Sequence, residues 1–310
     1  MNVLVTGGAG YIGSILTSAL LHEGHKVRVL DNFMFNQASL LDCCYHPNLN
    51  IIRGDARDKD LLSREIKLAD AIFPLACLTG APLCKNDPLA ASTTNLEAIK
   101  LILELRHPQQ IIIFPTTNSG YGVGQRNIYC TEETPLNPIS LYGRLKVEAE
   151  KILLDAGECI TLRLATVFGV SPRMRIDLLV NDFTYRAVAD RFIVLFEANF
   201  KRNYIHVRDV AQAFIHCLNN FFSMKNEPYN VVLSDANLSK RELCEEIKKV
   251  VPEFVVIESP IGKDPDKRNY IVSNDKIEAT GFKPAFYIQT GIQELVKGYQ
   301  IIRRNNFANV

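Results

Sequence analysis

The residues best suited to acid–base chemistry are a tyrosine and a lysine four positions apart, Tyr142 and Lys146. The pattern of Leu141–Ala156 predicts a helix, so both side chains should project from the same face. A free phenol has a pKa of about 10 and is a weak base at neutral pH. A neighbouring ammonium group stabilises the phenolate and lowers that pKa. The pair could therefore take the proton from a substrate hydroxyl.

Hydroxyl side chains gather before this helix, directly after Gln110–Pro115, which is predicted to be a strand. Groups of this kind at a strand end could hold a substrate hydroxyl in the orientation that proton transfer requires. We expect the substrate to contact Thr117, Asn118 and Ser119.

The first predicted strand, Asn2–Thr6, leads into a glycine-rich segment that opens a predicted helix. Glycine permits a tight turn and lets the backbone approach a pyrophosphate closely. The helix start adds free N–H groups and a positive partial charge, which favour an anion. This strand–loop–helix context predicts a dinucleotide site, with the sequence Gly7-Gly8-Ala9-Gly10-Tyr11-Ile12-Gly13.

The second predicted strand, Lys26–Asp31, ends on a carboxylate 18 residues beyond Gly13. Asp31 would accept hydrogen bonds from the adenosine ribose hydroxyls and repel a 2′-phosphate, so it favours NAD over NADP. Asp55 closes the third predicted strand and could accept from the adenine amino group, although a plain turn explains its position nearly as well. The positive nicotinamide ring would help Lys146 to lower the pKa of Tyr142.

Short β-branched runs alternate with helical patterns in the first half of the chain, and most of these runs are apolar throughout. That pattern is typical of strands covered on both faces. The alternation predicts right-handed βαβ units and an α/β fold of Rossmann type, with a doubly wound parallel sheet. The strands are expected at Asn2–Thr6, Lys26–Asp31, Asn50–Arg53, Ala71–Leu75, Gln110–Pro115, Cys159–Leu164 and Tyr229–Val232, and helices at Tyr11–Glu23, Asp58–Ile66, Asn95–Glu104 and Leu141–Ala156.

After about Phe168 the alternation stops, and isolated helical patterns such as Lys240–Val251 and Gln289–Arg303 follow. We expect these segments to form a smaller, discontinuous α/β lobe that binds the substrate against the carboxyl ends of the strands. The expected NAD-binding domain spans 1–168 and about 204–233, and the expected substrate lobe spans about 169–203 and 234–310.

The composition excludes several classes of function. The chain has 310 residues and a net charge of +1, so nothing indicates a nucleic-acid or membrane-surface partner. It shows neither a secretory signal nor about 18 consecutive apolar residues, which predicts a soluble, cytoplasmic protein. None of the eight cysteines forms a C-x-x-C pair, so we expect free thiols and no metal site.

Together these motifs resemble the NAD-dependent epimerase/dehydratase family of extended short-chain dehydrogenases/reductases, over nearly the whole chain. The resemblance implies an enzyme with NAD as cofactor and a nucleotide-diphosphate sugar as substrate. It also implies a homodimer joined through the helices that carry Asn95 and Tyr142. The motifs that carry it are Thr6–Gly13, Asp31, Thr117-x-x-x-Tyr121-Gly122, Tyr142-x-x-x-Lys146, Leu162-Arg163, Val167-Phe168-Gly169 and Arg202–Val210.

The resemblance also implies roles for single residues. Thr117, Tyr142 and Lys146 would form the catalytic triad, with Asn95 as a supporting fourth member. Arg202 and Arg268 match positions that contact the diphosphate, and guanidinium groups suit phosphate oxygens. The other substrate-binding candidates are Asn181, Arg173 and Arg175. For Arg173 and Arg175, a solvated surface arginine is the competing interpretation. The cofactor site would comprise Gly7, Gly10, Tyr11, Ile12, Gly13, Asp31, Asn32, Asp55, Ala56, Leu75, Ala76, Asn95, Tyr142, Lys146 and Thr166.

Departures from the family pattern narrow the reaction. Sugar 4,6-dehydratases carry an Asp-Glu pair after the catalytic threonine, whereas Asn118 and Ser119 stand here. The 3,5-epimerase/reductase members place a cysteine near this segment, and none lies between Thr116 and Gly122. What remains is oxidation or reduction at one ring carbon, C4, or 4-epimerisation through a ketosugar.

Long stretches are most similar to the GDP-heptose 4-dehydrogenases of bacterial surface-polysaccharide pathways. That similarity implies oxidation of the C4 hydroxyl of GDP-D-glycero-α-D-manno-heptose to a ketone. Hexose 4-epimerases usually have an asparagine in the place of Thr166, which disfavours simple galactose-type epimerisation. The matching segments are Gly80–Lys85, Thr117–Gly122, Ser171–Arg175, Asn181–Arg186 and Asp264–Arg268.

Three alternatives stay open at this point. A UDP-glucose-type 4-epimerase and a 4-ketosugar reductase share the ketone intermediate with the dehydrogenase. An NAD-binding regulatory protein would need the same cofactor site, although the intact Thr117, Tyr142 and Lys146 argue against it. No motif separates guanine from uracil as the base of the nucleotide.

Overall fold

The computed structural model is described here for residues 1–125, 128–260 and 268–302. Asp264–Lys267, part of one segment that resembles the heptose dehydrogenases, lies outside these residues. A seven-stranded, all-parallel sheet of order β11-β7-β5-β4-β1-β2-β3 forms the centre of the protein and confirms the predicted fold class. Its strands are β1 (Asn2–Thr6), β2 (Lys26–Asp31), β3 (Leu49–Arg53), β4 (Ala71–Pro74), β5 (Ile111–Thr117), β7 (Cys159–Leu164) and β11 (Glu227–Val231).

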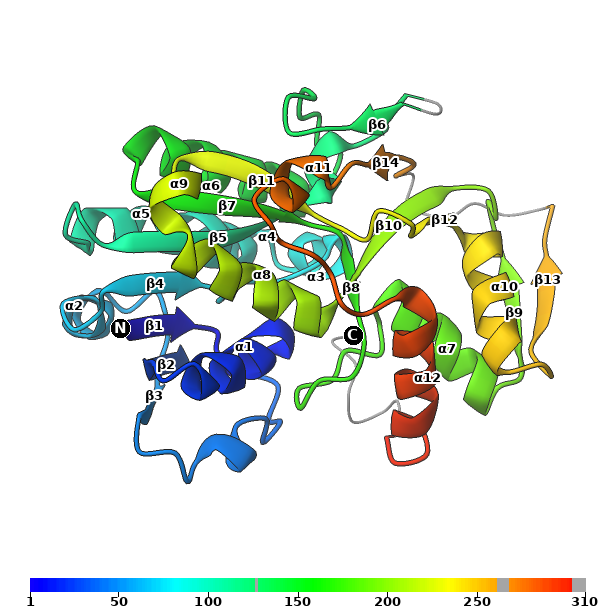
Figure 1. Cartoon of the computed structure of the whole chain (residues 1–310), viewed down its shortest axis with the longest axis horizontal. Coiled ribbons are helices and arrows are strands. Elements are labelled where there is room, and N and C mark those ends of the chain that lie inside the picture. Colours follow the sequence, from blue (N-terminus) through cyan, green and yellow to red (C-terminus); the bar gives the residue numbers. More distant parts are fainter. Residues whose placement is uncertain (126–127, 261–267, 303–310) are drawn as a thin grey trace.

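Each face of this sheet is covered by its own group of helices (Figure 1). In β1, Val3 and Val5 enter one hydrophobic core, and Leu4 between them enters the other. Side chains of a strand alternate between faces, so a strand covered on both sides must be apolar at every position. One core includes α1 (Tyr11–His22) and α8 (Val207–Asn219), and the other includes α2 (Lys59–Ile66), α5 (Ala98–Leu105) and α6 (Leu141–Ala156).

A second group of elements lies beside the carboxyl ends of the central strands and is called the second lobe (Figure 1). Its three-stranded sheet has the order β12-β10-β8, and β9 pairs with β13 in a separate ribbon. The lobe comprises β8 (Thr166–Phe168), α7 (Leu179–Ala189), β9 (Phe192–Leu195), β10 (Lys201–His206), β12 (Asn237–Ser239), α10 (Lys240–Val250), β13 (Val255–Glu258) and α12 (Ile288–Gly298).

Shorter elements complete the described chain. β6 (Tyr129–Cys130) pairs with β14 (Ile271–Val272) near the top of Figure 1. The remaining helices are η1 (Leu41–Cys43), α3 (Ala81–Asn86), α4 (Pro88–Ser92), the π-helical turn η2 (Thr93–Glu97), η3 (Asn118–Tyr121), α9 (Phe221–Met224) and α11 (Asp275–Glu278). Among the described residues, no helix has both the length and the apolar character needed to cross a membrane.

Charged side chains, some of them buried, connect the second lobe to the helices of the first. Asp209 on α8 accepts hydrogen bonds from the backbone N–H groups of Ala285 and Phe286, at 2.8 and 3.1 Å. Glu294 on α12 pairs with the buried His206 at 2.8 Å and with Arg208. His206, one of the predicted motif residues, therefore has a structural contact at the junction of β10 and α8.

Candidate active site

The site is positioned by the point where the strand order reverses. β1 has β2 on one side and β4 on the other, and in an open α/β sheet the crevice that binds the ligand is expected at the carboxyl edge of such a reversal. The loop after β1 holds the predicted glycines, and the loop after β4 holds Leu75 and Ala76, which are both partly exposed.

Two glycines are required by the close packing of this region. Gly7 has φ +71°, and a Cβ placed there would lie 2.5 Å from the backbone nitrogen of Ala76. A Cβ on Gly13 would lie 2.4 Å from the carbonyl oxygen of Gly7. Helix α1 begins at Tyr11, and Gly10 before it offers no side-chain cap to the first N–H groups. The free N–H groups at the start of α1 can bind an anion, so this segment fits the pyrophosphate of a dinucleotide.

Asp31 is held by the backbone at the end of β2. Its Oδ2 accepts from the N–H of Ala9 at 2.9 Å and its Oδ1 from the N–H of Phe33 at 2.8 Å. Burial raises the pKa of Asp31, and these hydrogen bonds oppose that rise. Asn32 is exposed beside it. The carboxylate thus has a fixed orientation next to the glycine loop, as the ribose-binding prediction requires.

Asp55 has a different environment from Asp31. Arg57 forms an ion pair with it at 2.6 Å and also donates its backbone N–H to Oδ1 at 2.9 Å. The hydrogen bond from the Arg57 side chain lowers the pKa of Asp55 more than burial raises it. Ala56 is buried between the two residues. An adenine group would have to share the Asp55 carboxylate with Arg57.

Tyr142 and Lys146 both lie near the start of α6, where Ser140 caps the helix by accepting from the N–H of Gly143 at 3.1 Å. Lys146 is only 3% exposed. Its Nζ donates to the carbonyl oxygen of Pro115 at 2.6 Å and lies 4.1 Å from the centre of the Phe114 ring. The ammonium group is therefore fixed against β5.

The electrostatics of Tyr142 differ from the prediction. Burial raises the pKa of Tyr142, and the main opposing charges are those of Arg175 and Arg268 rather than that of Lys146. Burial also lowers the pKa of Lys146 itself. Ionisation of the phenol therefore requires positive charge beyond the lysine, which a bound oxidised nicotinamide would supply.

The hydroxyl cluster forms as a local network at the end of β5. Thr117 donates to Oγ of Ser119 at 3.1 Å and accepts from its backbone N–H at 3.1 Å. Arg268 also donates to Oγ of Ser119. Asn118 between them is 1% exposed, and neither polar atom of its side chain has a hydrogen-bond partner among the described residues.

Asn95 positions the loop after β4. It lies in the π-helical turn η2, a type of distortion frequent at functional sites. Its Oδ1 accepts from the N–H of Leu78 at 2.8 Å, and its Nδ2 donates to the carbonyl oxygen of Leu78 at 2.9 Å. Asn95 therefore holds one residue of the loop through both of its backbone polar groups, and Cys84 lies 3.7 Å from its Nδ2.

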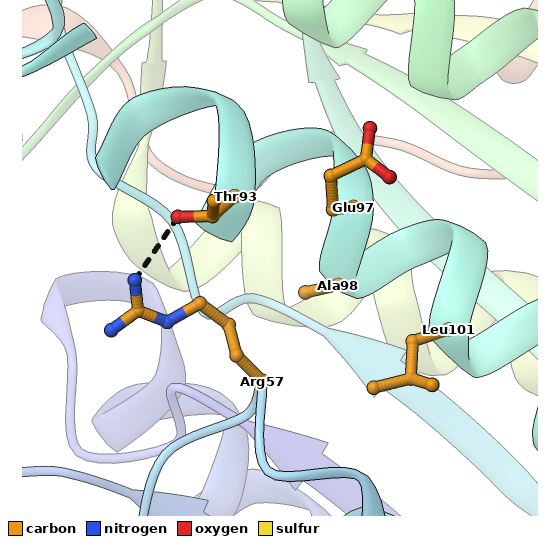
Figure 2. Close-up of a pocket in the computed structure, with 5 residues that line it drawn as sticks. All are labelled: Arg57, Thr93, Glu97, Ala98 and Leu101. Carbon is orange, nitrogen blue, oxygen red and sulfur yellow. Dashed lines mark hydrogen bonds between the residues drawn. The ribbon is translucent and has the colours of Figure 1, made fainter. Parts of the chain in front are cut away.

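Figure 2 shows a pocket lined in part by residues at the two ends of this π-helical turn, Thr93 and Glu97. Arg57 donates to Oγ1 of Thr93 there at 3.0 Å, and Glu97, Ala98 and Leu101 complete the lining. None of the triad residues or glycines lines it. This pocket is therefore separate from the candidate active site.

The segment Gly169–Asp177, called the strap, runs from the glycine loop toward the loop after β4. Tyr11 Oη donates to the carbonyl oxygen of Gly169 at 2.7 Å, and Ser171 Oγ donates to the carbonyl oxygen of Tyr11 at 2.7 Å. At the far end, Arg175 donates to Oγ1 of Thr79 at 2.7 Å and pairs with Asp177 at 2.5 Å. The strap thus links the start of α1 to the loop after β4.

Asn181 on α7 is buried against the strap and does not lie on an open surface. It is 0% exposed, accepts from the N–H of Gly169 at 3.1 Å, and donates to Oη of Tyr11 and to the carbonyl oxygen of Arg175. Arg202 on β10 is buried and donates to the carbonyl oxygen of Lys201 at 2.9 Å. Thr166 begins β8 and is partly exposed.

Sequence reasoning missed a buried network that holds α6 in place. Glu150 on α6 pairs with Arg163 on β7 at 2.7 Å, with both side chains almost fully buried. Arg163 also donates to Oη of Tyr121 at 3.1 Å, and this hydroxyl donates to Asn230 at 2.8 Å. The signal was an acidic residue two helical turns from Tyr142, on the expected inner face of α6.

Cys77 is a second residue that sequence reasoning missed, because the spacing of the cysteines predicts only free thiols. It follows β4 by three positions, and its thiol donates to the carbonyl oxygen of Leu78 at 3.5 Å. Burial raises the pKa of its thiol, so the group is protonated. Cys77 lies near the expected crevice because the strand order reverses between β1 and β4. The sequence alone does not predict which residues of the loop after β4 lie there.

Comparisons with known proteins agree with this geometry. The sequence pattern of the NAD dependent epimerase/dehydratase family matches residues 3–231. A UDP-glucose 4-epimerase of Lactobacillus helveticus is 28% identical over 276 residues, covering 81% of this chain and 82% of that protein. UDP-glucuronic acid decarboxylase 1 of Arabidopsis thaliana is 25% identical over 314 residues, covering 97% of this chain and 70% of that protein. The structure of a Thermus thermophilus UDP-glucose 4-epimerase with NAD has a TM-score of 0.83 at 26% identity, covering 97% of this chain and 99% of that one.

Proposed function

Since the chain belongs to the NAD-dependent epimerase/dehydratase family, we propose that it oxidises the C4 hydroxyl of a nucleotide-linked sugar to a ketone. The sugar nucleotide we propose is GDP-D-glycero-α-D-manno-heptose, an intermediate for a surface polysaccharide. The observation that supports the C4 chemistry is that Lys146, on the helix that carries Tyr142, contacts the end of β5 at Pro115, two residues before Thr117, and that no carboxylate stands next to Thr117.

NAD is the cofactor that the family requires and that the residues fit. The uncapped start of α1 suits its pyrophosphate, the Asp31 carboxylate suits its adenosine ribose, and Lys146 suits its nicotinamide ribose. When bound, NAD accepts the hydride that leaves the sugar carbon. The remaining steps belong to the protein's own side chains.

Tyr142 acts as the base that takes the C4 hydroxyl proton onto Oη. Its side chain is only partly exposed, so the two guanidinium groups act on it in a medium of reduced dielectric constant, and the ring of a bound oxidised cofactor would do the same. The hydroxyls of Thr117 and Ser119 orient the sugar oxygen toward Tyr142. Asn118 and Ser119 do not ionise near neutral pH, so elimination of water has no acid–base pair here.

A nucleoside diphosphate would be held from the second lobe. Arg202 and Arg268 supply guanidinium forks, and Arg268 already reaches the hydroxyl cluster through Ser119. UDP-sugar enzymes are prominent among the relatives. The proposal of a GDP-heptose therefore rests on the sequence similarity of the segments Gly80–Lys85 and Ser171–Arg175 to that dehydrogenase group.

A 4-epimerase is the second candidate, favoured by relatives that bear this name. It would form the same ketone, turn the sugar over, and return the hydride from the cofactor. The two candidates differ in whether NADH accumulates. A 4-ketosugar reductase would run the same step in reverse.

A panel of GDP- and UDP-linked hexoses and heptoses, analysed by mass spectrometry and NMR, tests the proposal. We expect a product lighter by the two hydrogens removed, with one NADH per ketone. A product of unchanged mass with inverted C4 would establish the epimerase. If every sugar is left unchanged while NAD binds tightly, the protein is a cofactor-binding regulator.

We also propose a homodimer through the faces of α6 and of the segment η2–α5. Leu89 on the neighbouring α4 is 75% exposed, and the pocket of Figure 2 lies beside α5. Light scattering should give a mass twice that of one chain. The Leu89→Lys variant should give a lower mass, closer to that of one chain. A monomer across all concentrations would contradict this arrangement.

A further inference from the structure

We propose that Arg173 of the strap binds the cofactor, at the phosphates of its adenosine half, rather than the diphosphate of the sugar nucleotide. The inference rests on the proposed function only in taking NAD as the ligand. It changes the role expected for Arg173 from the sequence, where it was grouped with the substrate arginines.

The first observation is where the strap is attached. Ser171 Oγ lies 3.0 Å from Oγ of Ser14 and donates to the carbonyl oxygen of Tyr11 at 2.7 Å. Both partners belong to the first turn of α1, whose N–H groups suit the cofactor pyrophosphate. In Figure 1 the chain between β8 and α7 correspondingly passes beside the start of α1. Arg173 is two residues further along this anchored segment.

The second observation is what surrounds the guanidinium group of Arg173. Its Cζ lies 4.0 Å from the centre of the Phe35 ring, and Nη1 donates to the carbonyl oxygen of Met174 at 3.1 Å. Phe35 belongs to the loop that follows Asp31 at the end of β2. The side chain is only 3% exposed, so it is not a solvated surface arginine.

The charges around Arg173 place it at the adenosine end of the crevice. Asp31 interacts with Arg173 electrostatically, whereas Tyr142 interacts with Arg175 and Arg268. Of the two strap arginines, Arg173 is therefore the one that acts on Asp31, and Arg175 the one that acts on the catalytic phenol. Burial and Arg175 lower the pKa of Arg173 to about 10, so a neighbouring anion would be favourable for its charged form.

A dinucleotide bound between Asp31 and Lys146 must pass its two phosphates beside the glycine loop. The guanidinium group of Arg173 belongs to a segment that is hydrogen-bonded to the start of α1, and it packs against the ring of Phe35. A group held in this way suits phosphate oxygens. Arg173 would also close the second lobe over the cofactor. The cofactor site would then require both lobes, because the glycine loop and Asp31 come from one and Arg173 from the other.

Displacement of NADH, followed by its fluorescence, tests this assignment at the cofactor site itself. The competitors are ADP-ribose, which carries the two phosphates, and adenosine, which carries none. For Arg173→Gln we expect ADP-ribose and NADH to bind about tenfold more weakly, with adenosine unchanged, because a charge-assisted contact to phosphate is lost. Arg173→Lys should recover part of the loss, and Phe35→Leu should weaken ADP-ribose binding a few-fold.

Calorimetry then measures the affinity of each variant for GDP and for UDP, which stand for the substrate nucleotide. Arg202→Gln is the matched control. Arg202→Gln should weaken one of these nucleotides and leave ADP-ribose unchanged, the reverse of Arg173→Gln. The assignment is overturned if Arg173→Gln weakens GDP or UDP but not ADP-ribose, or weakens adenosine as much as ADP-ribose. NADH binding does not need sugar turnover, so absence of reaction with every sugar would refute the proposed function and leave this inference standing.

Discussion

Two residues on the Rossmann side of the site, Asp31 and Lys146, are held by backbone groups, whereas two arginines across the site, Arg175 and Arg268, contact other side chains. Asp31 accepts two backbone N–H groups, and Lys146 donates to the carbonyl oxygen of Pro115. Across the crevice, Arg175 is held by Asp177 and Thr79, and Arg268 contacts Ser119.

From this difference we expect the two sides to have different roles, one in binding the cofactor and the other in selecting the sugar. Contacts to the backbone persist as long as the sheet is folded, so the cofactor side is fixed before any ligand arrives. Pairs between side chains can exchange one partner for a ligand oxygen at lower cost. Substitutions on the Rossmann side should therefore affect every substrate alike, and those on the second lobe should change which sugar is used.

The largest expected effect on catalysis comes from Tyr142→Phe. Loss of the base should lower kcat by about 1,000-fold, within the usual contribution of a general base. NADH binding should stay close to that of the wild type, because the rest of the cofactor site is intact. Stopped-flow absorbance of NADH formation measures the first quantity and fluorescence the second. Wild-type turnover in this variant would remove Tyr142 from the mechanism.

Glu150→Gln should have the largest effect on stability. It leaves Arg163 charged and buried without its partner, a loss of about 3–5 kcal/mol in the free energy of unfolding. Lys151→Gln on the same helix breaks an exposed pair with Asp155 and should cost less than about 1 kcal/mol. Urea denaturation of both variants compares them. Equal midpoints would mean that the buried network does not hold α6.

Asp31→Ala should weaken NAD binding about tenfold and reduce the preference for NAD over NADP, because both the ribose contact and the repulsion of a 2′-phosphate disappear. The effect should be the same with every sugar tested. Fluorescence titration with NADH and NADPH gives both affinities. An unchanged ratio of the two would exclude Asp31 from cofactor choice.

Arg175→Gln should shift the pH dependence of the reaction rather than abolish it. The Arg175 charge lowers the pKa of Tyr142, so its removal raises that pKa. The rate increases as the phenol ionises, so the rising limb of kcat against pH should move to higher pH. A profile that stays in place would show that Arg175 does not act on Tyr142.

Ser119→Ala should give the smallest effect, a rise of KM by a few-fold. It removes one hydroxyl from the network and leaves Thr117 in place. Ser119 is held by side chains, including that of Arg268, so this rise should differ between sugars, whereas the effect of Asp31→Ala should not. Steady-state kinetics with two sugar nucleotides would show whether the two sides behave differently.

The sequence predicted the parts of the molecule that depend on local rules. β1, β2, β7 and α6 occur at the predicted bounds, since buried parallel strands and capped helices leave clear patterns. The glycine loop followed from the need for a close backbone approach at Gly7 and Gly13. β5 extends two residues beyond its predicted end and carries Thr117.

Contacts between distant segments were not predictable in this way. The pKa of Tyr142 depends on Arg175 and Arg268, which are far along the chain and reach it only through the second lobe. The stretch Tyr204–Val232 was expected to return to the first domain, but β10 pairs with β8 and β12 in the separate sheet. Within that stretch, α8 and β11 join the large sheet and its helices. Asn181 likewise has its partners in three separate segments.

The most direct test of the central claim follows the hydrogen on C4. A GDP-heptose carrying deuterium at C4 is incubated with the enzyme and NAD, and the reduced cofactor is examined by mass spectrometry. The account predicts that the deuterium moves to the cofactor as the 4-keto sugar forms, and that Tyr142→Phe slows this transfer by about 1,000-fold. A product that keeps its deuterium at C4, or release of the deuterium to water, would contradict it.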